Sequence, residues 1–238
     1  MVNSDTIWEL IPESRVAAVV VANAVPIVGL VGFDTSGTGL LVFYWLEFTA
    51  LSVWALVRAV FSGKPRESDA DHPTIGDHID GDAGIPIPWT AVTVRYRTIP
   101  ALIVIVPLLA VVWIGFGGVV VGPVVATNST AEPPQWVIAG AVTVFVTEGG
   151  RTAVEYFYRG GYRNATVWMP VKGLFWQGFV LVGAGLAVVL IAREFAEGRS
   201  VTLEEAASGP LLGIVVFGKF TTDLVAYYLS DRERPLAN

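Results

Sequence analysis

The sequence predicts an all-α protein, an integral membrane six-helix bundle with both termini in the cytoplasm. Of its 238 residues, 53% are hydrophobic and only 15% are charged, and the mean hydropathy is +0.61. This composition is far more apolar than a soluble domain needs. The apolar residues form blocks of about 20, the length that crosses a hydrocarbon layer of roughly 30 Å.

Six apolar blocks are the predicted spans, within one transmembrane domain of residues 1–238. They must be helices, because backbone amides in lipid need hydrogen-bond partners within their own segment. Their boundaries carry a margin of about two to four residues. The predicted spans cover about residues 14–32, 40–61, 99–121, 135–158, 168–192 and 208–229.

Basic residues predict how these spans are threaded, because Lys and Arg that flank spans are retained on the cytoplasmic side. Two such residues, Arg193 and Arg199, lie in the odd-numbered connections. The even-numbered connections and both termini hold eleven: Arg15, Arg58, Lys64, Arg66, Arg95, Arg97, Arg159, Arg163, Lys172, Arg232 and Arg234. We therefore expect a protein of the plasma (cytoplasmic) membrane with both termini inside.

The long connection, residues 62–98, is predicted to be a mobile, acidic cytoplasmic loop. It holds six acids between Glu67 and Asp82 with no base among them. Acidic and histidine side chains there are weak candidates for binding a divalent cation: His72, His78, Asp77 and Asp80. Their spacing fits neither an EF-hand loop nor a zinc motif, which favours a disordered linker.

One further site is predicted in a connection on the outer side. Asn128 opens the triplet "NST", a glycosylation candidate, in the connection between the third and fourth spans.

Seven ionisable residues lie within or at the edge of the spans. They are Glu47, Glu148, Arg151, Glu155, Lys172, Lys219 and Asp223. Each is costly alone, since an Asp, Lys or Arg at helix centre costs about 2.5–3.5 kcal/mol. We therefore expect these side chains to face inward and to pair. Spacings of three and four place Glu148, Arg151 and Glu155 on one helical face, and Lys219 with Asp223 on one face of the last span.

Depth and charge balance predict contacts between the spans. Lys219 and Glu148 both lie near mid-bilayer, so a contact between them is feasible, and Glu47 can reach Lys219 if the bundle brings those helices together. Four acids against three bases leave one acid without a partner. Glu47, surrounded in sequence by aromatic residues, is predicted to be the neutral carboxyl, which would make it a proton carrier. Buried charge pairs that simply fix helix packing are the alternative.

Two motifs resemble a known family. "YWLEF" at 44–48 and "GKFTTDLVAYYLSDRE" at 218–233 are similar to motifs of a multi-pass membrane family of unknown function, domain of unknown function 6498. The resemblance implies a matching fold and no reaction. It matches Tyr44, Trp45, Glu47, Arg58, Lys219 and Asp223, and Tyr227 or Tyr228 stands where the family commonly has His. The acid-rich composition, with a pI near 4.9, is similar to that of salt-adapted archaea, which indicates a haloarchaeal-like member.

Transport coupled to protons or another ion is the predicted function. A membrane scaffold or sensor that acts through the acidic loop is the alternative, and an intramembrane enzyme that uses carboxylates is the less favoured class. With no cysteine, no His-Glu-x-x-His pair and no Gly-rich phosphate loop, we expect no cofactor and no familiar catalytic site. The expected partners are the lipid bilayer and either a second copy of the chain or another membrane protein, and not nucleic acid.

Overall fold

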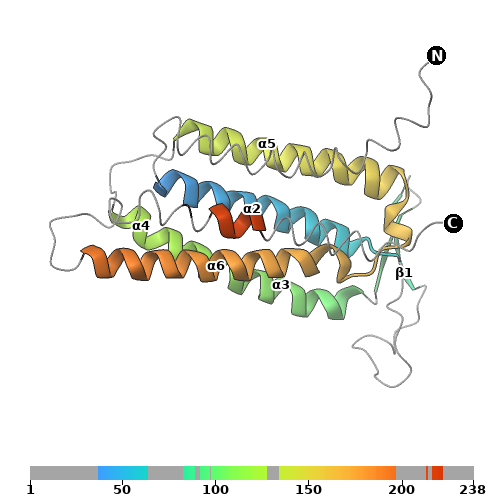
Figure 1. Cartoon of the computed structure of the whole chain (residues 1–238). Coiled ribbons are helices and arrows are strands. Elements are labelled where there is room, and N and C mark those ends of the chain that lie inside the picture. Colours follow the sequence, from blue (N-terminus) through green and yellow to red (C-terminus); the bar gives the residue numbers. More distant parts are fainter. Residues whose placement is uncertain are drawn as a thin grey trace, which may run out of the picture.

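The computed structural model describes residues 37–63, 83–88, 92–96, 98–127, 134–196, 213 and 216–221. Most of this part of the chain is helical (Figure 1). Five α-helices are labelled in the order of the chain: α2 (Gly37–Val60), α3 (Thr98–Ile114), α4 (Gly122–Thr127), α5 (Gln135–Arg151) and α6 (Met169–Ala196). Two π-helices continue them, η1 (Gly115–Val121) after α3 and η2 (Thr152–Tyr158) after α5.

Four helical segments among the described residues are long and apolar enough to cross a membrane: Thr38–Val60, Thr98–Ala126, Gln135–Tyr158 and Met169–Glu194. They confirm four of the six predicted spans and fit an integral membrane protein. The first predicted span, 14–32, lies outside the described residues. Of the last, 208–229, residues 213 and 216–221 are described, and they are helical.

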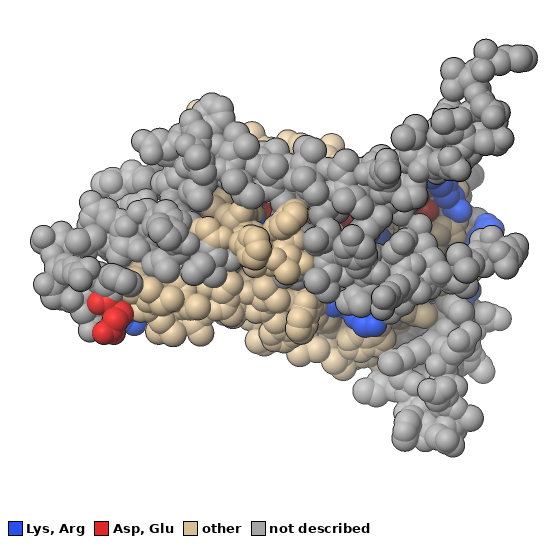
Figure 2. Space-filling model, viewed as in Figure 1, with Lys and Arg blue, Asp and Glu red and all other residues tan. Residues whose placement is uncertain are grey.

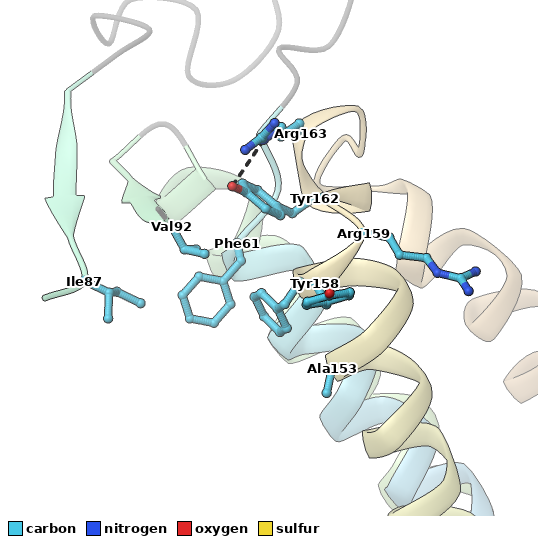
Figure 3. Close-up of a pocket in the computed structure, with 10 residues that line it drawn as sticks. Phe61, Ile87, Val92, Ala153, Tyr158, Arg159, Tyr162 and Arg163 are labelled. Atoms are coloured by element: carbon cyan, nitrogen blue, oxygen red, sulfur yellow. Dashed lines mark hydrogen bonds between the residues drawn. The ribbon is translucent and has the colours of Figure 1, made fainter. Parts of the chain in front are cut away.

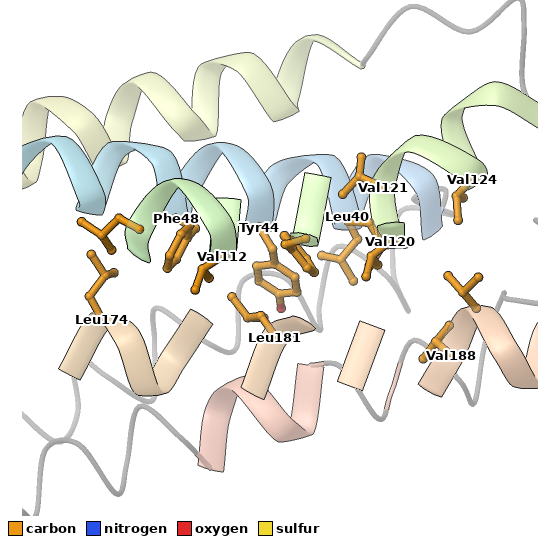
Figure 4. Packing of buried hydrophobic residues seen from close by; sticks show 14 of the residues in the cluster. Leu40, Tyr44, Phe48, Val112, Val120, Val121, Val124, Leu174, Leu181 and Val188 are labelled. Carbon is orange, nitrogen blue, oxygen red and sulfur yellow. The ribbon is translucent and has the colours of Figure 1, made fainter. Parts of the chain in front are cut away.

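Helix α2 lies at the centre of the bundle. It contacts α5 on one side and α6 and α3 on the other (Figure 1). Its residues Leu40, Tyr44 and Phe48 are buried against side chains such as Val112 of α3 and Leu181 of α6 (Figure 4). The outward faces of the helices carry exposed aliphatic and aromatic residues, for example Ile103, Val111, Phe179 and Leu190. Such a surface suits contact with lipid tails.

Aromatic rings of α2 lie directly over glycines of the neighbouring helices. A methyl group at Gly149 would lie 2.5 Å from Cζ2 of Trp54, and one at Gly117 would lie 2.6 Å from Nε1 of Trp45. The rings and the glycines pair as follows: Phe43 with Gly140, Trp45 with Gly117, Phe48 with Gly178, and Trp54 with Gly149. Because small residues let helices approach closely in lipid, these four contacts set how near the neighbours come to α2.

A short β-hairpin lies in the connection that the sequence predicts to be a mobile loop. Strand β1 (Gly84–Pro86) pairs antiparallel with β2 (Thr93–Arg95) in the register Gly84↔Arg95, Ile85↔Val94 and Pro86↔Thr93. Arg95 donates a hydrogen bond from Nη1 to the carbonyl of Gly63, which ties the hairpin to the end of α2. Part of the connection is therefore structured, because the chain must return beside α2 to begin α3.

The turn between η2 and α6 joins the same end of the bundle. It contains the 3₁₀-helix η3 (Gly161–Arg163), preceded by Gly160 with φ of 74°, a left-handed conformation that favours glycine. The carbonyl of Tyr162 accepts a hydrogen bond from the amide of Gly63 at 2.7 Å. The ends of α2 and η2, the hairpin and this turn therefore form one connected end of the molecule, which we call the hairpin end.

Candidate functional site

A buried ion pair joins α2 to the described part of the last predicted span. Lys219 Nζ lies 3.3 Å from Glu47 Oε1, and the two side chains are 6% and 16% exposed. Glu47 lies ten residues after Gly37 and thirteen before Val60, the two ends of α2. At 1.5 Å per residue it is therefore about 15 Å from one end of the helix and about 20 Å from the other. The pair sits close to the middle of the span.

Tyr44 also lies beside the ammonium group. Its ring, one helical turn before Glu47, has its centroid 5.5 Å from Lys219 Nζ, a distance at which a cation is attracted to an aromatic face. A Cβ atom added at Gly218 would lie 3.9 Å from the Cβ of Ala184 in α6. Residues 216–221 therefore pack close to α6, and this packing brings Lys219 to α2.

A second group of charges, here called the α5 charge chain, links α2 to α5. Arg58 Nη2 lies 3.2 Å from Glu148 Oε1, Arg151 Nη1 lies 3.8 Å from Glu148 Oε2, and Arg151 Nε lies 3.2 Å from Glu155 Oε2. The Glu148 side chain is 15% exposed and that of Glu155 is 47% exposed. The α5 charge chain thus begins at a mostly buried carboxylate and ends at one in contact with the surroundings. Its contacts confirm that Glu148, Arg151 and Glu155 share one helical face.

Hydrogen bonds from aromatic residues hold α2 parallel to α5. Trp54 Nε1 donates to the carbonyl of Phe145 at 2.9 Å, and the Tyr156 hydroxyl donates to the carbonyl of Arg58 at 2.5 Å. The indole N–H and the phenol O–H thereby find acceptors away from water. This bonding fixes the backbone that carries Arg58 beside the helix that carries Glu148. Neither Trp54 nor Tyr156 was singled out from the sequence. A tryptophan in one predicted span and a glycine in another would have been a usable signal of a close contact between the two helices.

Trp45 connects α2 to the start of η1. Its Nε1 donates to the carbonyl of Trp113 at 3.3 Å, and Trp113 Nε1 donates to Thr49 Oγ1 at 2.7 Å. The two indole rings lie with centroids 4.9 Å apart. Trp113 lies two residues before Gly115, where the helix changes from α to π, a change that often marks functional or strained sites. Trp45, which the family resemblance highlights, thus acts here as a packing residue, directly after Tyr44 and one turn before Thr49.

One expectation about the charges is wrong, and one of the two contacts that were feasible for Lys219 is formed. Glu47 is not the acid without a partner, because Lys219 lies beside it. Of the two contacts that depth made feasible for Lys219, the one with Glu47 is formed, whereas among the described residues the oxygens of Glu148 are paired with Arg58 and Arg151. Arg58 was counted as a flanking residue of α2, but its long side chain reaches back along the helix to Glu148, an effect that residue spacing alone does not reveal.

The remaining predicted sites lie outside the described residues. Asp223 and Tyr227 of the last span, Asn128 of the glycosylation triplet, and the loop residues His72, Asp77, His78 and Asp80 all fall there. Within the described ranges, no three His, Asp or Glu side chains gather in a way that could hold a metal ion. The glycosylation and metal sites therefore stay predictions.

Comparison with known proteins places the chain in a family. No curated protein and no solved structure matches it. A family model does match, over residues 9–238, and this range contains every span and both charge groups described above. The chain therefore belongs to the family of unknown function DUF6498.

Proposed function

We propose that this multi-pass protein carries protons, or another ion coupled to protons, across the plasma membrane, and that the Glu47–Lys219 pair is its proton-binding site. The observation that carries this proposal is the burial of both side chains close to the middle of a membrane-spanning helix. Ionisable residues at that depth are expensive, and they commonly mark ion pathways and proton relays.

The chemistry of the pair suits this role. A carboxylate beside an ammonium group is also a proton acceptor beside a proton donor. When the proton passes from Lys219 Nζ to Glu47 Oε1, two opposite charges become two neutral groups, and the net charge of the pair stays at zero. Both states are therefore tolerated in a low-dielectric interior, where a lone charge is not.

The α5 charge chain supports a route between water and the bundle interior. It extends from mostly buried Glu148 to half-exposed Glu155, which leads toward the hairpin end. Basic residues gather at that end, where the space-filling view shows most of its blue atoms (Figure 2). Because basic flanks are retained inside, we infer that the hairpin end faces the cytoplasm. With 14–32 and 208–229 as the remaining spans, both termini would lie on that side.

A membrane scaffold is the second candidate, and one observation favours it. The Arg58–Glu148 contact joins α2 to α5 directly, and a buried ion pair can fix which helices pack together without moving any ion. The Glu47–Lys219 pair would then serve the same purpose between α2 and the last span. The two candidates differ in whether loss of the pair changes proton flux or only stability.

Proton flux in vesicles tests the proposal. The full chain is reconstituted into liposomes that contain a pH-sensitive dye, and the decay of an imposed pH gradient is followed with potassium and valinomycin present. We expect the unaltered protein to dissipate the gradient several-fold faster than protein-free vesicles. Glu47→Gln and Lys219→Met should each return the rate to that of empty vesicles, whereas Glu194→Gln, an exposed carboxyl near the end of α6 that belongs to neither charge group, should keep the flux.

Folding is measured on the same samples by gel filtration and circular dichroism. If the unaltered protein is no faster than empty vesicles, and if the double variant Glu47→Gln with Lys219→Met is as stable as the unaltered chain, the pair is architectural. The scaffold interpretation then replaces transport.

A further inference from the structure

A cavity of about 680 Å³ opens at the hairpin end, and its lining contains no member of the two charge groups that the proposed function uses. Its volume lies within the range of about 300–1,000 Å³ that is typical of ligand pockets. Figure 3 shows side chains from the end of α2, from the hairpin and from η2 around this space. The apolar part of the lining consists of Phe61, Ile87, Val92, Ala153 and Phe157.

Two arginines and two tyrosines form the other part of the lining. Arg163 is held in place by Tyr162, because its Nε donates to the hydroxyl at 3.3 Å and its Cζ lies 5.6 Å from the ring centroid. Among the described residues, neither Arg159 nor Arg163 forms an ion pair with an acid. Figure 3 shows Arg163 beside Tyr162 at the cavity, whereas the Arg159 side chain points away from the apolar lining, so the positive charge at the cavity itself comes from Arg163.

The cavity lies at the level where the membrane-spanning helices end. The span of α2 ends at Val60 and the span of α5 and η2 ends at Tyr158, and Phe61 and Arg159 are the next residues of the chain. Tyr158 is 88% exposed, as expected for a tyrosine in the interfacial belt of a membrane protein. Ala153 and Phe157 lie within the span, and Arg159 and Arg163 follow it, which matches the order of acyl chain and headgroup in a lipid.

We propose that this cavity binds an anionic phospholipid, with its phosphodiester at Arg163, the first part of an acyl chain against the apolar lining, and Arg159 adding positive charge nearby. Guanidinium groups form charge-assisted, often bidentate hydrogen bonds with phosphate oxygens. Basic pockets beside transmembrane helices bind lipid headgroups on the same principle. A free phosphate ion would use the arginines but not Phe61, Val92 and Phe157, so the lining favours the lipid over the ion.

Native mass spectrometry of the full chain tests the proposal. The protein is incubated in mild detergent with dioleoyl phosphatidylglycerol, and retained lipid is counted; dioleoyl phosphatidylcholine and inorganic phosphate are the comparison probes. We expect phosphatidylglycerol to be retained in preference to phosphatidylcholine. The double variant Arg159→Gln with Arg163→Gln should weaken retention by about fivefold for each arginine removed. Because both side chains are exposed, these changes should leave the fold intact.

Two matched variants sharpen the result. Arg193→Gln removes an exposed arginine at the far end of α6 and should leave retention unchanged. The double variant Arg159→Lys with Arg163→Lys keeps both charges and should keep most of the binding. Equal retention of the two lipids, or unchanged retention in the glutamine variant, would overturn the proposal. Complete displacement of the lipid by millimolar inorganic phosphate would also overturn it, by assigning the site to the free ion.

Discussion

The two charge groups of this protein differ in depth and in exposure. Glu47 and Lys219 lie near the middle of the membrane-spanning region, and both are mostly buried. The α5 charge chain begins at Glu148, which is also mostly buried, but it ends at Arg151 and Glu155, which are exposed. Only the second group therefore has members that can exchange their protein partner for water or a lipid headgroup.

This difference indicates how much each ion pair matters to stability. A buried charge that loses its partner cannot recover its hydration, so removal of one member is costly. A charge near the surface keeps part of its hydration, and an exposed ion pair contributes little. The effect of substitution should therefore fall steadily from Lys219 to Glu155. Three substitutions, with expected effects from large to small, test this difference between the two charge groups.

The largest effect is expected for Lys219→Met. Methionine fills a similar volume but removes the cation that lies 3.3 Å from Glu47, which should lower the free energy of unfolding by about 3 kcal/mol. The double variant Glu47→Gln with Lys219→Met removes both charges and should recover most of this loss. The measurement is unfolding in mixed micelles titrated with a denaturing detergent. Equal losses in the single and double variants would show that the methionine disturbs packing and not charge.

An intermediate effect is expected for Gly149→Ala, which tests the packing that holds the α5 charge chain. The new methyl group would lie 2.5 Å from Cζ2 of Trp54, so the ring or the helix must move. Overpacking of this kind costs about 1–3 kcal/mol. Gly150→Ala is the matched control, because a methyl group there has no atom of a neighbouring helix within 4 Å among the described residues. If both changes have the same effect, helix propensity and not the Trp54 contact determines the outcome.

Much of the fold could be predicted from the sequence, because the membrane restricts what a backbone can do. A run of apolar residues long enough to span has to be a helix, and four predicted spans are confirmed on that basis. The pairing of Glu148, Arg151 and Glu155 also follows from local spacing, since residues three and four apart share a helical face. Both arguments need information from one segment at a time.

Contacts between segments could not be predicted in the same way. The pairing of Glu47 with Lys219 depends on which helices are neighbours, and depth alone allowed Glu148 as another partner. The glycines of α6 make the same point. Gly178 and Gly185 lie against side chains of neighbouring helices, whereas Gly173 and Gly183 have nothing within 4 Å where a Cβ would lie. Nothing in the spacing of the four distinguishes the face that packs from the face that does not.

The smallest effect is expected for Glu155→Gln, at the exposed end of the α5 charge chain. Arg151 loses one carboxylate at 3.2 Å but keeps Glu148 at 3.8 Å, and both members of the lost pair face the surroundings. The free energy of unfolding should change by less than about 0.5 kcal/mol, as for exposed helix pairs.

Glu148→Gln is the matched comparison, because it keeps the length of the side chain and removes a negative charge that Arg58 and Arg151 share. It should cost clearly more than Glu155→Gln in the same mixed-micelle titration. If Glu155→Gln lowers the free energy of unfolding as much as Glu148→Gln does, the Glu155 end of the α5 charge chain is shielded from water in the membrane. The difference in exposure between the two charge groups would then not exist.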